Sequence, residues 1–116
     1  MKLNKDLIGK VLNSKVEKIS EHRSSENVEI IYAKGEYNPF EVINKYELIH
    51  KMKQFALDNG YSLQSNFDTI KGYCNSMPLY WGTRSDGGHG FTISGENEFE
   101  AVYNAVDYII KELNNE

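Results

Sequence analysis

The sequence has one cysteine and no long apolar run, and these two shortages exclude an internal disulfide and a membrane-spanning helix. A single thiol, Cys74, cannot form a disulfide within the chain, so we expect a reducing compartment and a buried structural thiol. No stretch of about 18 consecutive apolar residues is present, so no transmembrane helix is predicted. The first residues also lack the apolar segment of a signal peptide. These features predict a cytoplasmic protein that does not act in a membrane.

Basic residues are fewer than acidic ones, with 13 Lys and Arg against 17 Asp and Glu. The 116 residues have a net charge of −4 and a pI near 5.4, which argues against a protein that binds duplex DNA. Hydrophobic residues make up 40%, enough for one domain, residues 1–116, with a thin core. A thin core and eight tyrosines favour a homo-oligomer. The charge is uneven, basic in residues 2–18 and acidic in residues 96–116. Two solvated faces would explain this, and so would head-to-tail attraction between subunits.

The C-terminal helix has the strongest periodic signal. It is expected to begin near Asn97 and to end near Leu113. Asn97 with Glu100 forms a capping box at its start. Its apolar residues recur at the helical spacing that produces one continuous buried stripe. They are Phe99, Val102, Tyr103, Val106, Ile109, Ile110 and Leu113.

A central helix is predicted over Lys45 to Asp58, with Gly60 as its C-cap. Its inward residues are expected to be Tyr46, Ile49, Met52, Phe55 and Ala56. Two starts fit the sequence. One uses the Asn-Pro-Phe-Glu run at 38–41, with Pro39 in the first turn. The other uses the capping box at 44–47 and leaves residues 40–43 extended. We favour the second, because residues 42 and 43 are β-branched.

The remaining elements are expected to be strands. Residues 10–20 and 27–34 form a predicted hairpin, preceded by a short helical turn at residues 5–8. Residues 61–65, 73–77 and 90–94 alternate as half-buried antiparallel strands do. Pro78 is expected to end or bulge its strand. The predicted fold is α+β, with an antiparallel sheet of about five strands and two helices packed on one face, in the order ββαβββα.

A glycine-rich segment at residues 80–92 is the predicted ligand site. Glycines allow close backbone approach and free N–H groups for an anion, while Arg and Trp grip phosphates and stack on rings. The candidate ligand-binding residues are Tyr80, Trp81, Arg84, Ser85, Asp86, Gly88, His89 and Thr92. A plain hairpin loop with a turn at Asp86-Gly87 is the alternative for the segment. For Trp81 the alternative to a stacking platform is a core or flanking residue.

No catalytic residue, metal site or cofactor is predicted. The segment has no P-loop lysine, and it leads into a strand rather than the helix of a dinucleotide fingerprint. His22, His50 and His89 have no metal-ligand spacing, and His50 is expected at the surface. Ser85, Asp86 and His89 lie too close in sequence for a hydrolytic triad, whose members come from separate elements.

The sequence has Asn-Gly-Tyr at 59–61, after the central helix, and Glu-x-Glu-Ala at 98–101, at the start of the C-terminal helix. In these two segments it resembles small accessory proteins of bacteriophages and prophages, in which a short helix ends in Asn-Gly-Tyr and a Glu-x-Glu-Ala helix closes the chain. The resemblance covers about the C-terminal two thirds and omits residues 1–40 and the glycine-rich segment, so it assigns no functional residue. It implies a mobile element acting in the cytosol of a bacterial host.

Many proteins of this kind are small, acidic, non-enzymatic inhibitors of host defence. Some are anti-CRISPR proteins, and others, like the Thoeris anti-defence sponges, hold a nucleotide-derived immune signal. The resemblance therefore implies a binding protein that sequesters a nucleotide-type small molecule. A direct inhibitor of a host defence protein is the alternative, and a small phosphodiesterase or hydrolase is the second alternative.

Overall fold

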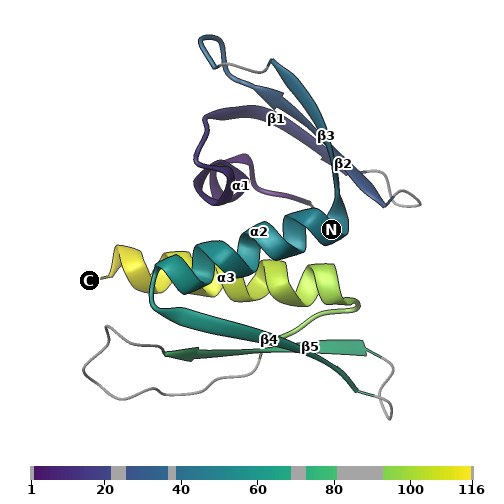
Figure 1. Cartoon of the computed structure of the whole chain (residues 1–116), viewed down its shortest axis with the longest axis vertical. Helices are drawn as coiled ribbons and strands as arrows, with labels where there is room; N and C mark the ends of the chain where they lie inside the picture. Colours follow the sequence, from purple (N-terminus) through teal and green to yellow (C-terminus); the bar gives the residue numbers. More distant parts are fainter. Residues whose placement is uncertain (1, 22–25, 37–38, 69–72, 81–92, 116) are drawn as a thin grey trace. The chain divides into compact units, whose positions relative to one another are not determined.

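The computed structural model describes residues 2–21, 26–36, 39–68, 73–80 and 93–115. Within these residues the chain forms three helices and six strands, so the predicted α+β class is confirmed (Figure 1). The elements are α1 (Lys5–Leu12), β1 (Val16–Glu21), β2 (Asn27–Tyr32), β3 (Phe40–Asn44), α2 (Lys45–Asp58), β4 (Tyr61–Asp68), β5 (Tyr73–Tyr80), β6 (Ile93–Ser94) and α3 (Glu98–Asn114). The chain divides into two compact units, Met1–Lys51 and Met52–Glu116, with the boundary inside α2.

The predicted single sheet of about five strands and the order ββαβββα are wrong. The described strands form two three-stranded antiparallel sheets, β1-β2-β3 in the first unit and β4-β5-β6 in the second. Their order with the helices is αβββαβββα. The additional elements are α1 and β3. Alternation along a chain identifies a strand, but contacts between distant segments decide which strands pair, so the sequence pattern could not show that the strands divide between two sheets.

Helix α1 replaces a predicted short turn and the start of a predicted strand. The Asn4 side chain accepts hydrogen bonds from the N–H groups of Asp6 and Leu7, which caps the first turn. The helix ends at Asn13, whose φ of 53° is left-handed. The Ser14 N–H then donates to the Gly9 carbonyl oxygen at 3.0 Å, as in a Schellman motif. These two caps hold residues 5–12 in a helix, so β1 begins only at Val16.

The β1-β2-β3 sheet is a meander with a defined register. Ile30 pairs with Ile19 on β1 and with Glu41 on β3. A register shift between Val16 and Lys18 marks a bulge in β1. The face that carries Val28, Ile30 and Ile43 is buried, with these side chains at most 2% exposed. This face supplies part of the core of the first unit.

Helix α2 begins at Lys45, as favoured from the sequence, and residues 40–44 form strand β3. The Asn44 side chain accepts a hydrogen bond from the Tyr46 N–H, and Gly60 follows the helix with a φ of 89°. Tyr46 was expected to face inward, but it is 67% exposed, and Leu48 is fully buried instead. The predicted inward residues Ile49, Met52 and Ala56 are buried and Phe55 is half-buried, so only Tyr46, in the first turn, departs from the predicted face.

In the second unit, α3 packs against the β4-β5-β6 sheet (Figure 1). The predicted stripe is confirmed for its first five members, which are at most 7% exposed, while Ile110 and Leu113 are partly exposed. The Glu100 N–H donates to Asn97 Oδ1 at 2.8 Å, which confirms Asn97 as the N-cap of the predicted capping box. Strand β5 was expected to end or bulge near Pro78, yet its pairing with β4 continues without a shift to Tyr80. Proline has no backbone N–H to donate. Among the described residues β6 pairs with Asn75 and Ser76 and not with Pro78, so the pairing with β6 needs no N–H at position 78.

Candidate functional site

The predicted ligand site lies almost wholly outside the described residues. Tyr80 is the last residue of β5, and its register partner is Tyr61, whose side chain is fully buried. The other candidate residues, Trp81, Arg84, Ser85, Asp86, Gly88, His89 and Thr92, lie within 81–92 and are not described. The chain leaves β5 beside β4 and returns at Ile93 to pair near the middle of β5. Ligand binding by this segment therefore stays a prediction.

The first unit contains an exposed apolar surface that the sequence pattern did not reveal. Register partners point to the same face of a sheet, so one face of β1-β2-β3 can be assigned from the pairing. We call it the outer face; it consists of Lys18, Ser20, Asn27, Glu29, Ile31, Phe40, Val42 and Asn44. Three of these residues are large, apolar and exposed: Ile31 at 40%, Phe40 at 54% and Val42 at 49%. We call these three the apolar patch.

The members of the apolar patch are neighbours. Ile31 and Phe40 are register partners across β2 and β3, and Val42 lies two residues beyond Phe40 on the same strand. Cross-strand partners and residues two apart have side chains in reach of one another. Lys18, the partner of Ile31 on β1, and Glu29, the partner of Val42 on β2, border the patch with opposite charges. The apolar patch therefore lies at the β3 edge of the outer face and is bordered by polar residues on β1 and β2, and grouped exposed apolar side chains beside polar ones are typical of protein-binding surfaces.

On the opposite, inner face, polar side chains are tied to partners. The Tyr32 hydroxyl donates a 2.8 Å hydrogen bond to Glu41 Oε1. Burial and this hydrogen bond raise the pKa of the Tyr32 phenol well above its usual range. Lys45 Nζ lies 2.6 Å from Glu21 Oε1, with both side chains less than one-fifth exposed. These pairs allow the inner face to be buried, whereas the exposed apolar residues lie on the outer face.

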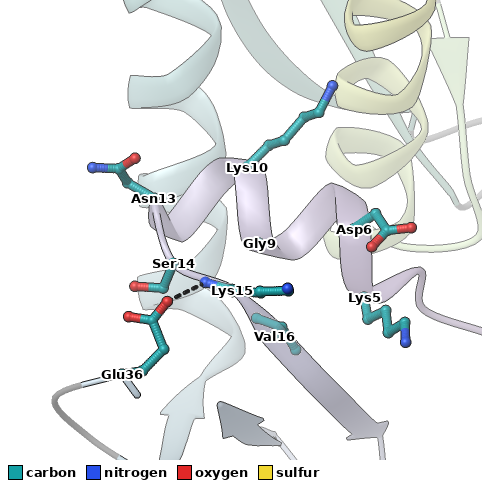
Figure 2. Close-up of a pocket in the computed structure, with 9 residues that line it drawn as sticks. All are labelled: Lys5, Asp6, Gly9, Lys10, Asn13, Ser14, Lys15, Val16 and Glu36. Atoms are coloured by element: carbon teal, nitrogen blue, oxygen red, sulfur yellow. Dashed lines mark hydrogen bonds between the residues drawn. The ribbon is translucent and has the colours of Figure 1, made fainter. Parts of the chain in front are cut away.

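A depression of about 670 Å³ lies beside α1 in the first unit (Figure 2). It is lined by Lys5, Asp6, Gly9, Lys10, Asn13, Ser14, Lys15, Val16 and Glu36. The Lys15 N–H donates to Glu36 Oε1 at 2.8 Å, while the Lys10 side chain points away from this contact (Figure 2). Three ammonium groups and two carboxylates are mixed in the lining, so the site does not strongly favour an anion or a cation. The lining therefore does not indicate one class of ligand for this depression.

Metal-ligating and titratable groups give no further site within the described part of the chain. No cluster of three or more His, Cys, Asp or Glu side chains is found among these residues. His50 is exposed on α2, as expected from the sequence, and His22 and His89 are not described. The three described helices also include none long and apolar enough to cross a bilayer.

The sequence does contain a signal for the apolar patch, in the places where alternation fails. Apolar residues are adjacent at Ile30 and Ile31, and again at Val42 and Ile43. In a strand, adjacent residues point to opposite faces, so each such pair places an apolar side chain on both faces. For residues 42 and 43, β-branching by itself indicates only an extended backbone. The exposure of one member of each pair appears only in the folded structure.

Comparisons with protein-family models, with curated proteins and with solved structures find no match to this chain. The resemblance to phage accessory proteins is thus neither supported nor contradicted by a relative.

Proposed function

We propose that this protein acts without catalysis, by binding a protein partner through the apolar patch on the outer face of β1-β2-β3. The proposal is supported by one observation, the juxtaposition of Ile31, Phe40 and Val42 at 40–54% exposure. Large apolar side chains grouped on a polar-rimmed surface are typical of protein-binding sites. The three residues lie on paired strands, so the surface is held in shape before a partner arrives, which lowers the entropic cost of binding.

The size of the effect can be estimated from burial. Full burial of a side chain of this kind stabilises by about 1.5–3 kcal/mol, and each is already about half buried. Covering the rest would contribute roughly 1 kcal/mol per residue. Three residues together would then contribute about 3 kcal/mol, or roughly 100-fold in affinity. The apolar patch would thus supply a substantial part of the affinity, with rim contacts adding specificity.

The partner in this proposal is a protein of a bacterial antiviral system, and the protein blocks it stoichiometrically in the host cytosol. This setting rests on the sequence resemblance to phage accessory proteins. A blocking protein needs only affinity for its target, not complementarity to a transition state. A small chain with one well-formed surface meets this requirement.

The test is a plaque assay on bacteria that carry a single antiviral system, with and without this protein. Wild-type protein should restore phage plating on at least one system. Ile31→Lys and Phe40→Ser should each reduce the restoration about fivefold or more, because each removes roughly 1 kcal/mol of binding. Leu57→Ser is the matched control, since Leu57 is an equally exposed apolar residue, at 46%, on α2.

The outcomes separate the parts of the proposal. If Ile31→Lys and Phe40→Ser stay folded and restore plating as well as wild type, the apolar patch is not the working surface. If wild-type protein restores plating on none of a broad panel of systems, the proposed setting is wrong. Direct contact would be established by purifying a complex between this chain and a protein of the inhibited antiviral system, and by showing that the Ile31→Lys variant does not form it.

Sequestration of a nucleotide-derived signal by residues 80–92 is the second candidate. It is favoured by the concentration of Gly, Arg, His and Trp in that segment of the sequence. The protein would be incubated with nucleotide signals, separated from free ligand and denatured, and the released material analysed. Intact nucleotide returned after denaturation supports sequestration, and a converted nucleotide indicates a phosphodiesterase or hydrolase. If no nucleotide is retained, this candidate fails and the protein-partner proposal stands alone.

A further inference from the structure

Strand β3 forms one edge of the β1-β2-β3 sheet, and the hydrogen bonds at its ends show which of its backbone groups face outward. The Tyr32 N–H donates to the Pro39 carbonyl oxygen, and the Lys45 N–H donates to the Glu26 carbonyl oxygen. In an antiparallel ladder the bonded positions alternate, so odd-numbered residues of β3 bond to β2. The backbone N–H groups of Phe40, Val42 and Asn44 therefore point to the edge, together with the carbonyl groups of Phe40 and Val42.

The two edge strands of this sheet, β1 and β3, differ in the features that prevent an edge from pairing with another strand. Strand β1 has a bulge between Val16 and Lys18, carries the exposed charged residues Glu17 and Lys18, and packs against α1. Bulges, charges and a covering helix are the usual means of preventing edge-to-edge pairing. Strand β3 pairs with β2 without a register shift, contains no lysine, and exposes Phe40 and Val42. Pro39 lies only at its entrance, so five consecutive residues remain suited to pairing.

We propose that β3 pairs with β3 of a second copy of this chain, antiparallel about a two-fold axis at Val42. In this register Val42 lies opposite Val42 of the other copy, and Phe40 lies opposite Asn44. Two of the three outward N–H groups of each copy then find acceptors: each Val42 N–H reaches the other Val42 carbonyl, and each Asn44 N–H reaches the other Phe40 carbonyl. Each half of the interface is the complement of itself, as a two-fold dimer requires.

Charge is compatible with this pairing. Glu41 is the one charged residue of β3, and in the proposed register it lies opposite Ile43 rather than its own copy. Like charges directly opposite would destabilise a strand pair, and this register avoids them. Residues 1–51 contain nine Lys or Arg and eight Asp or Glu, so the units that meet are close to neutral. The acidic surplus of the chain lies in residues 52–116.

The pairing would produce one six-stranded sheet in which the two apolar patches adjoin. The dimer does not depend on the proposed function, but it would double the apolar surface available to a partner. A five-residue strand pair is a small interface, so we expect a weak, concentration-dependent dimer. Sedimentation velocity of the full chain from about 1 to 500 micromolar should show the mass rising from monomer towards dimer.

Charge at the two-fold axis tests the register. Val42→Lys and Val42→Glu should each be monomeric over the same range, because each places like charges directly opposite one another. An equimolar mixture of the two should associate at least tenfold more strongly than either alone. Ile31→Lys changes the apolar patch on the middle strand and should leave the dimer intact. Circular dichroism of each variant checks its fold.

Cross-linking tests the same geometry even if a charged variant fails to fold. Val42→Cys, in a Cys74→Ser background, should be joined by a bismaleimide that spans about 8 Å. Ile31→Cys in the same background should not, because two β2 strands would lie three strand spacings, or about 14 Å, apart. Failure of Val42→Cys to cross-link, or a monomer at all concentrations, would overturn the dimer. Loss of plating restoration by Ile31→Lys without loss of the dimer would concern the proposed function alone.

Discussion

The Tyr32 hydroxyl and the Glu41 carboxylate are joined across β2 and β3 by a 2.8 Å hydrogen bond on the inner face of the sheet. Burial is the first cause of the raised pKa of Tyr32, and the hydrogen bond and charge of Glu41 add to it. The pair holds a polar contact beside the buried side chains of Ile30 and Ile43. The hydrogen bond therefore requires both the observed pairing of β2 with β3 and a protonated Tyr32 hydroxyl.

This pair predicts a loss of stability at alkaline pH. Because the folded pKa of Tyr32 lies above its unfolded value near 10, the folded state holds the proton more tightly. Below pH 10 both states are protonated and stability is unaffected by this group. As pH rises above 10 the unfolded state loses its proton first, so stability falls. Tyr32→Phe should lessen this fall, measured by urea unfolding at pH 8 to 11.

A companion variant separates charge from burial. Glu41→Gln keeps an oxygen acceptor for the Tyr32 hydroxyl but removes the negative charge, so the pKa of Tyr32 should fall towards its ordinary value. The difference in absorbance titration between each protein and its Tyr32→Phe counterpart isolates this phenol from the other seven tyrosines. An unchanged titration in Glu41→Gln would show that burial alone sets the pKa.

Val106→Asp should unfold the second unit. Val106 is fully buried in the middle of the α3 stripe, so the substitution would bury a carboxylate. The expected loss is several kcal/mol, comparable with the whole stability of a small domain. Asn114→Asp adds the same charge at the exposed end of the same helix and should cost far less. Thermal melts of the two variants make the comparison, and equal melting temperatures would contradict the buried position of Val106.

Gly95→Ala should destabilise the start of α3. A Cβ at this position would lie 2.8 Å from the Glu100 carbonyl carbon and closer still to the Ala101 nitrogen. Both neighbours are backbone atoms, so relief requires the chain to move, at an expected cost of about 1–3 kcal/mol. The neighbouring Glu96 is exposed, and Glu96→Ala should change stability by less than about 0.5 kcal/mol. Chemical denaturation would reveal no difference between the two if the close approach at Gly95 were unimportant.

Asn13, the left-handed residue that ends α1, can be tested with one substitution that should destabilise the protein and one that should not. Asn13 has φ 53° and ψ 44°, a conformation that costs most residues about 1–2 kcal/mol and costs glycine little. Asn13→Ala should therefore lower the free energy of unfolding by about 1 kcal/mol, while Asn13→Gly should be near neutral or stabilising. The measurement is the urea concentration at the midpoint of unfolding for each variant. A midpoint for Asn13→Ala equal to or higher than that for Asn13→Gly would contradict the left-handed cap at Asn13.

For the nucleotide-binding candidate, Arg84→Ala and Trp81→Ala should each weaken nucleotide retention at least about tenfold, or about 1.4 kcal/mol. Arg84 would pair two phosphate oxygens, and Trp81 would stack on a base. Equilibrium dialysis measures retention, and circular dichroism checks the fold. If Trp81→Ala unfolds the protein, Trp81 belongs to the core, and if both variants retain nucleotide fully, the segment is only a connection.

The helices were the most predictable part of this fold, and their caps explain why. The Asn97 cap and the stripe from Phe99 to Ile109 follow from spacing within one segment, and the structure confirms them. The start of α2 was also correct, because β-branched residues in β3 argued against a longer helix. The length of α1 was missed, since its end depends on Asn13 adopting a left-handed conformation that asparagine takes in only some contexts.

The candidate surface was far less predictable than the helices. Ile31 and Val42 stand next to Ile30 and Ile43, and nothing in the sequence says which of each pair is covered. The glycine-rich segment is a candidate by its composition alone, and residues 81–92 lie outside the part of the chain that the structure describes. Composition can suggest which segment binds a ligand. Whether a side chain is exposed depends on which other parts of the fold pack over it.

The sequence by itself determined the α+β class, the span of the central and C-terminal helices and most of their buried faces. These properties depend on residues three and four apart, which the chain brings together whenever a helix forms. Only the tertiary structure decided that the strands form two sheets, and that Ile31, Phe40 and Val42 share an exposed face at the β3 edge. Strand pairing and exposure are set by long-range contacts, and one residue of register moves every side chain to the opposite face.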